Sequence, residues 1–241
     1  MLALWKKEIM SFFGSMTGYL VAGVFLVATS LFLWFIPGNM NIPMGGYATL
    51  EPLFWIAPWI YLFLVPATTM RLFAEEKRNR TIELLLTHPV SEWHIVLSKY
   101  FAGLTLVVLS LVPTLVFYYS VNQLASPAGN LDHGAIWGSY LGLVLLAAIY
   151  VGIGVFTSSL GKNQIIAFVL AVVLCYFLYD GFAAAASLPG LKGAGSLLAY
   201  LGIAEHYDSI SRGVLDSRDL LYFISVSVIF LWLTRTVLNR R

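Results

Sequence analysis

Glu205 and His206 are residue types found in hydrolytic zinc sites, where a helix presents two histidines four positions apart and a glutamate acts as the base. Four positions after His206 the sequence has Ile210, so the HExxH motif is absent. The four histidines, at positions 88, 94, 133 and 206, would also lie on two different sides of the membrane in the topology derived below. The sequence therefore predicts no metal site.

Gly161, Lys162 and Asn163 resemble the end of a phosphate-binding P-loop, in which backbone N–H groups and a lysine hold nucleotide phosphates. That motif also needs an earlier glycine and a Ser or Thr after the lysine, and neither is present. The segment joins two apolar runs, whereas a P-loop joins a strand to a helix. We expect no ATP site and no catalytic residue on this chain.

Asp180, in Tyr179-Asp180-Gly181, is the only acid expected near membrane depth. Ionisable groups inside a membrane are costly and commonly mark a transport pathway. We therefore treat Asp180 as a candidate pathway residue. A solvated helix end is the alternative.

The composition of the chain indicates the environment in which these residues lie. Apolar residues make up 59% of the chain and charged residues 11%, with a mean hydropathy of +0.83. Soluble domains have about 25% charged residues. The sequence thus predicts an all-α integral membrane protein. Cys175 is the single cysteine, so it forms no internal disulfide.

Six apolar runs approach the length of about 20 residues that a bilayer core requires. Residues 1–13 carry Lys6, Lys7 and Glu8 among apolar side chains, which favours a retained interfacial helix over a signal peptide. Prolines in spans two and three predict bends, and glycines in span four predict close helix packing. The six spans are expected at residues 15–36, 53–72, 97–121, 136–160, 165–186 and 220–238.

Basic residues set the orientation, because they gather on the cytoplasmic side of membrane proteins. With the N-terminus inside, only Lys192, Arg212 and Arg218 of the 14 basic residues lie outside, which leaves 11 inside. Both termini are therefore expected in the cytoplasm, and the protein in a bacterial inner membrane.

The segment from Arg71 to Lys99 contains nine of the chain's 26 charged residues. It predicts a cytoplasmic loop at residues 74–96. Within it, Ile82, Leu85 and Leu86 share one face of a short amphipathic helix that Thr81 could cap. Pro89 would end this helix.

The longest outer segment covers residues 187–219. Residues 195–203 are apolar but only about half the length of a span, which predicts a short re-entrant or interfacial helix before span six. This helix could gate an exit, or it could only seal the bundle. The candidate gate residues are Leu197, Leu198, Tyr200 and Leu201.

The segment from Glu75 to Ser91 resembles the pattern E-K-x-x-G-T-x-E-x-L-L-x-x-P-V-S, which follows the second span of ABC-2 type transporter permeases. Arg80 stands where that family usually has glycine. Within the family, the chain is most similar to gliding-motility permease subunits of the GldF group, and a nitrous-oxide-operon permease is the alternative. The residues that carry this narrower likeness are Ser11-Phe12-Phe13-Gly14, Gly18-Tyr19-Leu20, Ala57-Pro58-Trp59, Pro66-Ala67, Thr69-Met70-Arg71, Ser139-Tyr140-Leu141-Gly142-Leu143, Asn163-Gln164-Ile165 and Ala167-Phe168.

The resemblance implies two six-span subunits and two cytoplasmic ATPase subunits, with ATP and Mg on the ATPase. The second permease subunit would be a GldG-like partner or another copy, the lipid bilayer is a further partner, and nucleic acid is not one. The loop after span two would dock on the ATPase as a coupling helix, and residues 160–164 would add a second contact. The candidate coupling residues are Glu75, Glu76, Lys77, Thr81, Ile82, Glu83, Leu84, Leu85, Pro89, Val90, Ser91, Gly161, Lys162, Asn163 and Gln164.

The sequence also allows other interpretations of this chain. The charged loop could be only a solvated connection, but exposed leucines at positions 84–86 would then form an unusual apolar patch. The chain could instead be a structural anchor of a motility or secretion machine. An intramembrane enzyme is disfavoured by the scarcity of polar residues in the spans.

Overall fold

The computed structural model describes the chain except for residues 83–90, 128, 188–194, 215 and 240–241. All the secondary-structure elements in the described residues are helices. Six stretches are long and apolar enough to cross a membrane, which confirms the predicted all-α integral membrane fold. These stretches are Gly18–Phe35, Glu51–Arg78, Glu92–Leu124, His133–Leu160, Gln164–Ala186 and Ser217–Asn239.

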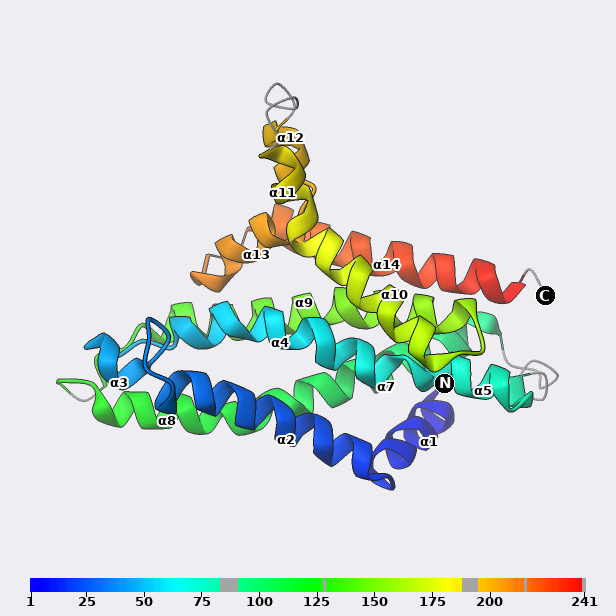
Figure 1. Ribbon diagram of the computed structural model, residues 1–241, viewed down its shortest axis with the longest axis horizontal. Helices are drawn as coiled ribbons and strands as arrows, with labels where there is room; N and C mark the ends of the chain where they lie inside the picture. Colours follow the sequence, from blue (N-terminus) through cyan, green and yellow to red (C-terminus); the bar gives the residue numbers. More distant parts are fainter. Residues whose placement is uncertain (83–90, 128, 188–194, 215, 240–241) are drawn as a thin grey trace.

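The long helices run roughly side by side in an elongated bundle (Figure 1). In chain order the elements are α1 (Leu2–Phe13), α2 (Met16–Ser30), a π-helical turn (Leu31–Phe35), α3 (Ile42–Gly45), α4 (Glu51–Thr69), α5 (Arg71–Arg78), α7 (Glu92–Leu111), a 3-10 turn (Val112–Thr114), α8 (Leu115–Leu124), α9 (His133–Leu160), α10 (Gln164–Tyr176), a second π-helical turn (Phe177–Gly181), α11 (Phe182–Ala186), α12 (Gly195–Ala199), α13 (Ile203–Ser211) and α14 (Ser217–Asn239).

Helix α9 is the centre of the bundle. It packs against α4, α7, α10, α13 and α14, and it has the largest buried share of the six long stretches. Its glycines permit close contacts, as the sequence predicted: a Cβ on Gly154 would lie 1.9 Å from Thr69 Oγ1 of α4, and one on Gly142 would lie 2.6 Å from Ile210 Cγ2 of α13. Helices α2, α10 and α14 instead lie in stretches whose most apolar windows are only 22% buried, and many of their apolar side chains are exposed.

The second long stretch differs from the expected span 53–72. It starts at Glu51 and continues as helix α5 to Arg78, beyond the point where residues 74–96 were expected to form a loop. Helix α4 runs through Pro58 and Pro66, whereas Pro113 coincides with the 3-10 turn between α7 and α8. The regular α-helix is therefore interrupted at the proline of span three, where a bend was expected.

The segment before α14 also differs from expectation. Residues 195–203 were expected to form one short helix, but α12 ends at Ala199 and a second helix, α13, begins at Ile203. Helices α11 and α12 pack on each other and form an arm that projects away from the bundle (Figure 1). Helix α13 lies on α9, because Ile203, Tyr207 and Ile210 place one apolar face toward the core.

Candidate functional site

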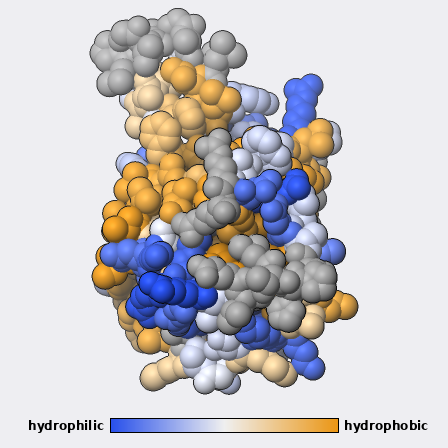
Figure 2. Space-filling model, turned by 90° about the vertical axis from the view of Figure 1, so that its right-hand side faces the viewer, coloured by the Kyte–Doolittle hydropathy of each residue, from blue (hydrophilic) through white to orange (hydrophobic). Residues whose placement is uncertain are grey.

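The charged residues of the predicted coupling segment gather at one end of the bundle. We call this the charged end; it comprises α1, α5, the first turns of α7 and the turn Gly161–Gln164, and the opposite end is called the α13 end. Figure 2 shows the charged end face-on, with hydrophilic side chains over it and hydrophobic side chains on its flanks. Its described residues include Glu75, Glu76, Lys77, Thr81, Ile82 and Ser91.

Ser158 of α9 fills the break between α4 and α5. Its hydroxyl donates to the Met70 carbonyl at 2.8 Å and accepts from the backbone N–H groups of Phe73 at 2.9 Å and Ala74 at 3.1 Å. Met70 is the residue between the two helices, and Phe73 and Ala74 lie in the first turn of α5, where the regular ladder is interrupted. Helix α5 is therefore attached to α9 by hydrogen bonds at its first turn.

Lys77 attaches the last turn of α5 to the end of α9. The side chain is 1% exposed, and its ammonium donates to the carbonyl of Ser159. A cation at this position complements the partial negative charge of a helix C-terminus. Directly after this contact the chain enters Gly161–Gln164, where the Asn163 side chain caps α10 by accepting from the Ile165 N–H at 2.9 Å. The structure thus joins the two chain segments that were predicted to contact the ATPase.

A buried lysine connects α1, α5 and α7. Lys99 Nζ of α7 lies 2.8 Å from Glu8 Oε1 of α1 and 2.9 Å from Glu76 Oε1 of α5, and it donates to the Leu72 carbonyl at 2.7 Å. The lysine side chain is 3% exposed and the carboxylates 14% and 15%. An ammonium group can be buried only with such partners, because removing it from water is costly. We call Lys99, Glu8 and Glu76 the Lys99 cluster.

Two cation–π contacts extend these connections. The Arg71 guanidinium lies 4.1 Å from the ring centroid of Phe12 in α1, and Arg235 of α14 lies 5.2 Å from that of Trp93 in α7. Arg235 Nε also donates to Glu92 at 3.2 Å. Helices α1 and α14 are thereby linked to the same end of the bundle.

Arg80 has a positive φ of 59°, in the left-handed region that favours glycine. This explains why the family pattern has glycine at this position. Thr81 and Ile82 are already helical, and the N–H groups that the Thr81 side chain was expected to cap lie outside the described residues. The Thr81 hydroxyl donates to the Glu76 carbonyl at 3.4 Å.

Part of the predicted coupling helix lies outside the described residues, namely Glu83, Leu84, Leu85, Pro89 and Val90. Ser91 is exposed at the start of α7, and its hydroxyl lies 2.7 Å from His94 Nδ1. At the charged end Lys162 and Asn163 are exposed, whereas Gly161 and Gln164 are half-buried.

The candidate pathway and gate residues lie elsewhere. Asp180 is half-buried in the π-helical turn after α10, beside a cavity described below. Leu198 is half-buried on α12, Tyr200 and Leu201 are exposed in the turn before α13, and the side chain of Leu197 is not described. The structure therefore does not bring Asp180 or these gate residues near the coupling residues.

Sequence reasoning missed a buried His206–Asp219 pair that joins α13 to α14. His206 Nδ1 lies 2.7 Å from Asp219 Oδ1, and Nε2 lies 2.9 Å from the Tyr200 carbonyl. The imidazole also stacks on Tyr222, with ring centroids 3.9 Å apart. Among the described residues, no three His, Cys, Asp or Glu side chains are placed to hold a metal ion.

Comparison with protein families gives one match. The family model described as "ABC-2 family transporter protein" matches residues 45–234, well over half of the chain. This range contains α4 to α13 and most of α14. No curated protein matches the chain.

Proposed function

The chain belongs to the ABC-2 transporter family and is a membrane permease component, and we propose that a separate ATPase subunit docks on its charged end. The observation that carries this proposal is the set of contacts that join α5 to the rest of the bundle: Ser158, Lys77 and the Lys99 cluster. A docking segment must be rigidly attached to the membrane helices if ATP-driven closure is to move them. Helix α5 has such attachments to α1, α7 and α9.

The coupling residues divide into two groups under this proposal. Glu76 and Lys77 act as internal connections, because their side chains face other helices of this chain. The ATPase would contact residues 83–90 together with the exposed Lys162 and Asn163. The charged end then faces the cytoplasm, and ATP and Mg are bound by the partner.

The narrower assignments are also proposals. The likeness to the GldF group supports a role in gliding motility or secretion, with two ATPase copies and either a GldG-like subunit or a second copy as the permease partner. The exposed apolar faces of α2, α10 and α14 offer surface for lipid or for that partner. A nitrous-oxide-operon permease and a structural membrane anchor are the competing functions.

Co-purification with the ATPase tests the docking site. Leu85→Asp should abolish capture of the ATPase, whereas Leu124→Asp, an equally polar change at an exposed leucine of the α13 end, should leave capture unchanged. Lys77→Met should keep the ATPase bound but lower permease-dependent stimulation of ATP hydrolysis about tenfold or more, since it removes a contact made only within the permease. Capture of the ATPase by Leu85→Asp at the wild-type level would refute the docking site.

The prediction that residues 195–203 could gate an exit has its own test. Leu198→Lys places a charge in the arm, so transport by a complete ABC complex should fall while assembly with the ATPase persists. Normal transport by this variant would leave α12 with a sealing role only. A wild-type complex that works equally well with an inactive ATPase would instead favour the structural anchor.

A further inference from the structure

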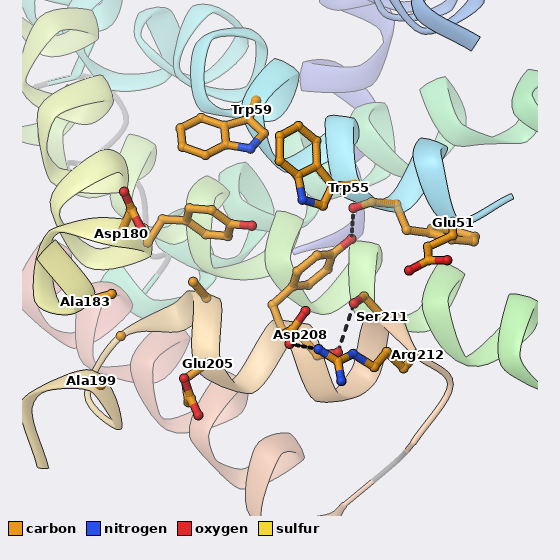
Figure 3. Close-up of a pocket in the computed structure, with 15 residues that line it drawn as sticks. Glu51, Trp55, Trp59, Asp180, Ala183, Ala199, Glu205, Asp208, Ser211 and Arg212 are labelled. Carbon is orange, nitrogen blue, oxygen red and sulfur yellow. Dashed lines mark hydrogen bonds and ion pairs between the residues drawn. The ribbon is translucent and has the colours of Figure 1, made fainter. Parts of the chain in front are cut away.

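At the α13 end, α4, α13 and the π-helical turn after α10 border an open cavity of about 530 Å³ (Figure 3). Four acidic side chains line it: Glu51, Asp180, Glu205 and Asp208. Arg212 is the one basic residue among the lining residues, and it is paired with Asp208. The cavity therefore has an excess of negative charge, which repels anions and attracts cations.

Aromatic rings form the other wall of this cavity. Trp55 and Trp59 lie one turn apart on α4 and are 59% and 36% exposed (Figure 3). Trp59 packs edge-on against Tyr179 with ring centroids 5.7 Å apart, and Tyr179 lies 6.4 Å from Tyr207. Exposed faces of tryptophan and tyrosine attract ammonium groups, most strongly where water is partly excluded.

A backbone carbonyl of α4 that lacks its usual helical partner holds this aromatic wall in place. Pro58 has no N–H to donate to the carbonyl of Phe54, so that carbonyl is left without its helical partner. The Tyr207 hydroxyl donates to it at 2.7 Å. Burial raises the pKa of Tyr207 well above its ordinary value, so the phenol keeps the proton that it donates. Helix α13 is thereby fixed to α4 beside the cavity.

A second cavity of about 510 Å³ lies along α4 on the other side of Trp59. The two share Trp59. Its walls are almost entirely apolar and come from α2, the π-helical turn that follows α2, α4 and Phe168 of α10. Along α4, Glu51, Trp55, Trp59, Phe63 and Ala67 follow one another at four-residue spacing, which leads from the acidic cavity into the apolar groove over about 24 Å of helix.

We infer that the two cavities together bind a cationic amphiphile, with its amine or quaternary ammonium head among Trp59, Asp180 and Glu205 and its hydrocarbon chain in the groove between α2 and α4. The negative charge of the first cavity favours a cationic head group, because an anionic head group would face unpaired carboxylates there. The apolar groove favours an uncharged hydrocarbon tail, since it offers no polar side chain to solvate a second charge. This inference rests on the proposed transport function and names the chemical class of its substrate.

A binding assay without ATPase tests the inference. The full chain is placed in phosphatidylcholine nanodiscs, and energy transfer from tryptophan to a dansyl-tagged dodecyltrimethylammonium probe is titrated. The same measurement is made with a dansyl-tagged dodecyl sulfate. Tetramethylammonium chloride, the head group alone, is added as a competitor.

The cationic probe should bind at least about tenfold more tightly than the anionic one, which corresponds to about 1.4 kcal/mol. Asp180→Asn with Glu205→Gln should weaken the cationic probe about tenfold. Asp216→Asn neutralises an exposed acid near the same end that does not line the cavity, and it should leave binding unchanged. Ala67→Trp fills the groove and should weaken both probes, whereas tetramethylammonium should displace only the cationic probe.

Equal binding of the two probes, or unchanged binding after neutralisation of Asp180 and Glu205, would overturn the inference. A groove covered by a second copy would give disulfide-linked dimers of Phe63→Cys in a Cys175→Ala chain and binding insensitive to Ala67→Trp, which would also overturn it. Since the assay contains no ATPase, these failures leave ATPase capture unaffected. Loss of the docking site with intact probe binding would refute only the proposed function.

Discussion

Replacing Lys99 by methionine tests whether the Lys99 cluster stabilises the charged end. The change keeps an unbranched chain of similar length but removes the ammonium that Glu8, Glu76 and the Leu72 carbonyl share. Two carboxylates, each about 15% exposed, then lose their buried cation, and only the exposed Lys7, whose Nζ lies 3.9 Å from Glu76 Oε1, still pairs with one of them. Breaking a buried ion pair costs about 3–5 kcal/mol, and partial exposure of both acids favours the lower value, about 3 kcal/mol. In a chain of this size the thermal midpoint should fall by about 6–12 °C.

Thermal unfolding in nanodiscs, followed by tryptophan fluorescence, measures this shift. Lys6→Met is the matched control, because Lys6 is an exposed lysine of α1 and its replacement should change the midpoint by less than about 1 °C. Combining Lys99→Met with Glu8→Gln and Glu76→Gln removes the whole cluster and should recover about half of the loss. A fall of less than about 2 °C for Lys99→Met, or no recovery in the triple variant, would contradict the reasoning.

Gly154→Ala should lower the unfolding free energy by about 1–3 kcal/mol, because the added methyl group would overlap the side chain of Thr69. Gly23→Ala is the control and should not change it, because the space around its Cβ is open. Thermal unfolding measures both variants. Arg80→Gly should be neutral or stabilise by up to about 1 kcal/mol, since it relieves a left-handed backbone, and a clear loss in the same assay would contradict that. Cysteines at Ser91 and Ser126, in a chain without its native cysteine, should react with an impermeant thiol reagent from the inside and the outside respectively. Labelling of position 91 from outside would reverse the proposed orientation.

The number and type of the long helices could be predicted because apolar run length is a local property of the sequence. The extent of α5 could not. Its charges favoured a solvated loop, but Phe73 and Lys77 donate hydrogen bonds to Ser158 and Ser159 respectively, more than 80 positions later in the chain. Such distant partners leave no local signal, so Lys77 looked like a docking residue although its side chain is internal.

The α13 end was harder to predict for two reasons. The apolar spacing of Ile203, Tyr207 and Ile210 is a helical signal, but the intervening charges and the short length hid it. The pairing of His206 with Asp219 depends on how α13 meets α14, which the sequence does not encode locally. The cavity beside Asp180 likewise forms only when three separate elements converge, so a single acid near the membrane was all that could be recognised.

The insertion of Ser158 into the break after Met70 determines how motion can pass through the protein. Because one hydroxyl satisfies the carbonyl of Met70 and two N–H groups of α5, the break in the helix leaves none of these three groups unpaired at membrane depth, and it ties the start of α5 to α9. Lys77 fixes the far end of α5 to the same helix. In kinematic terms α4, α5 and α9 form one lever, because α4 also packs closely on α9 where Thr69 meets Gly154. A push on the charged end would then turn α9 as a unit, and through α9 the residues of α13 that line the acidic cavity.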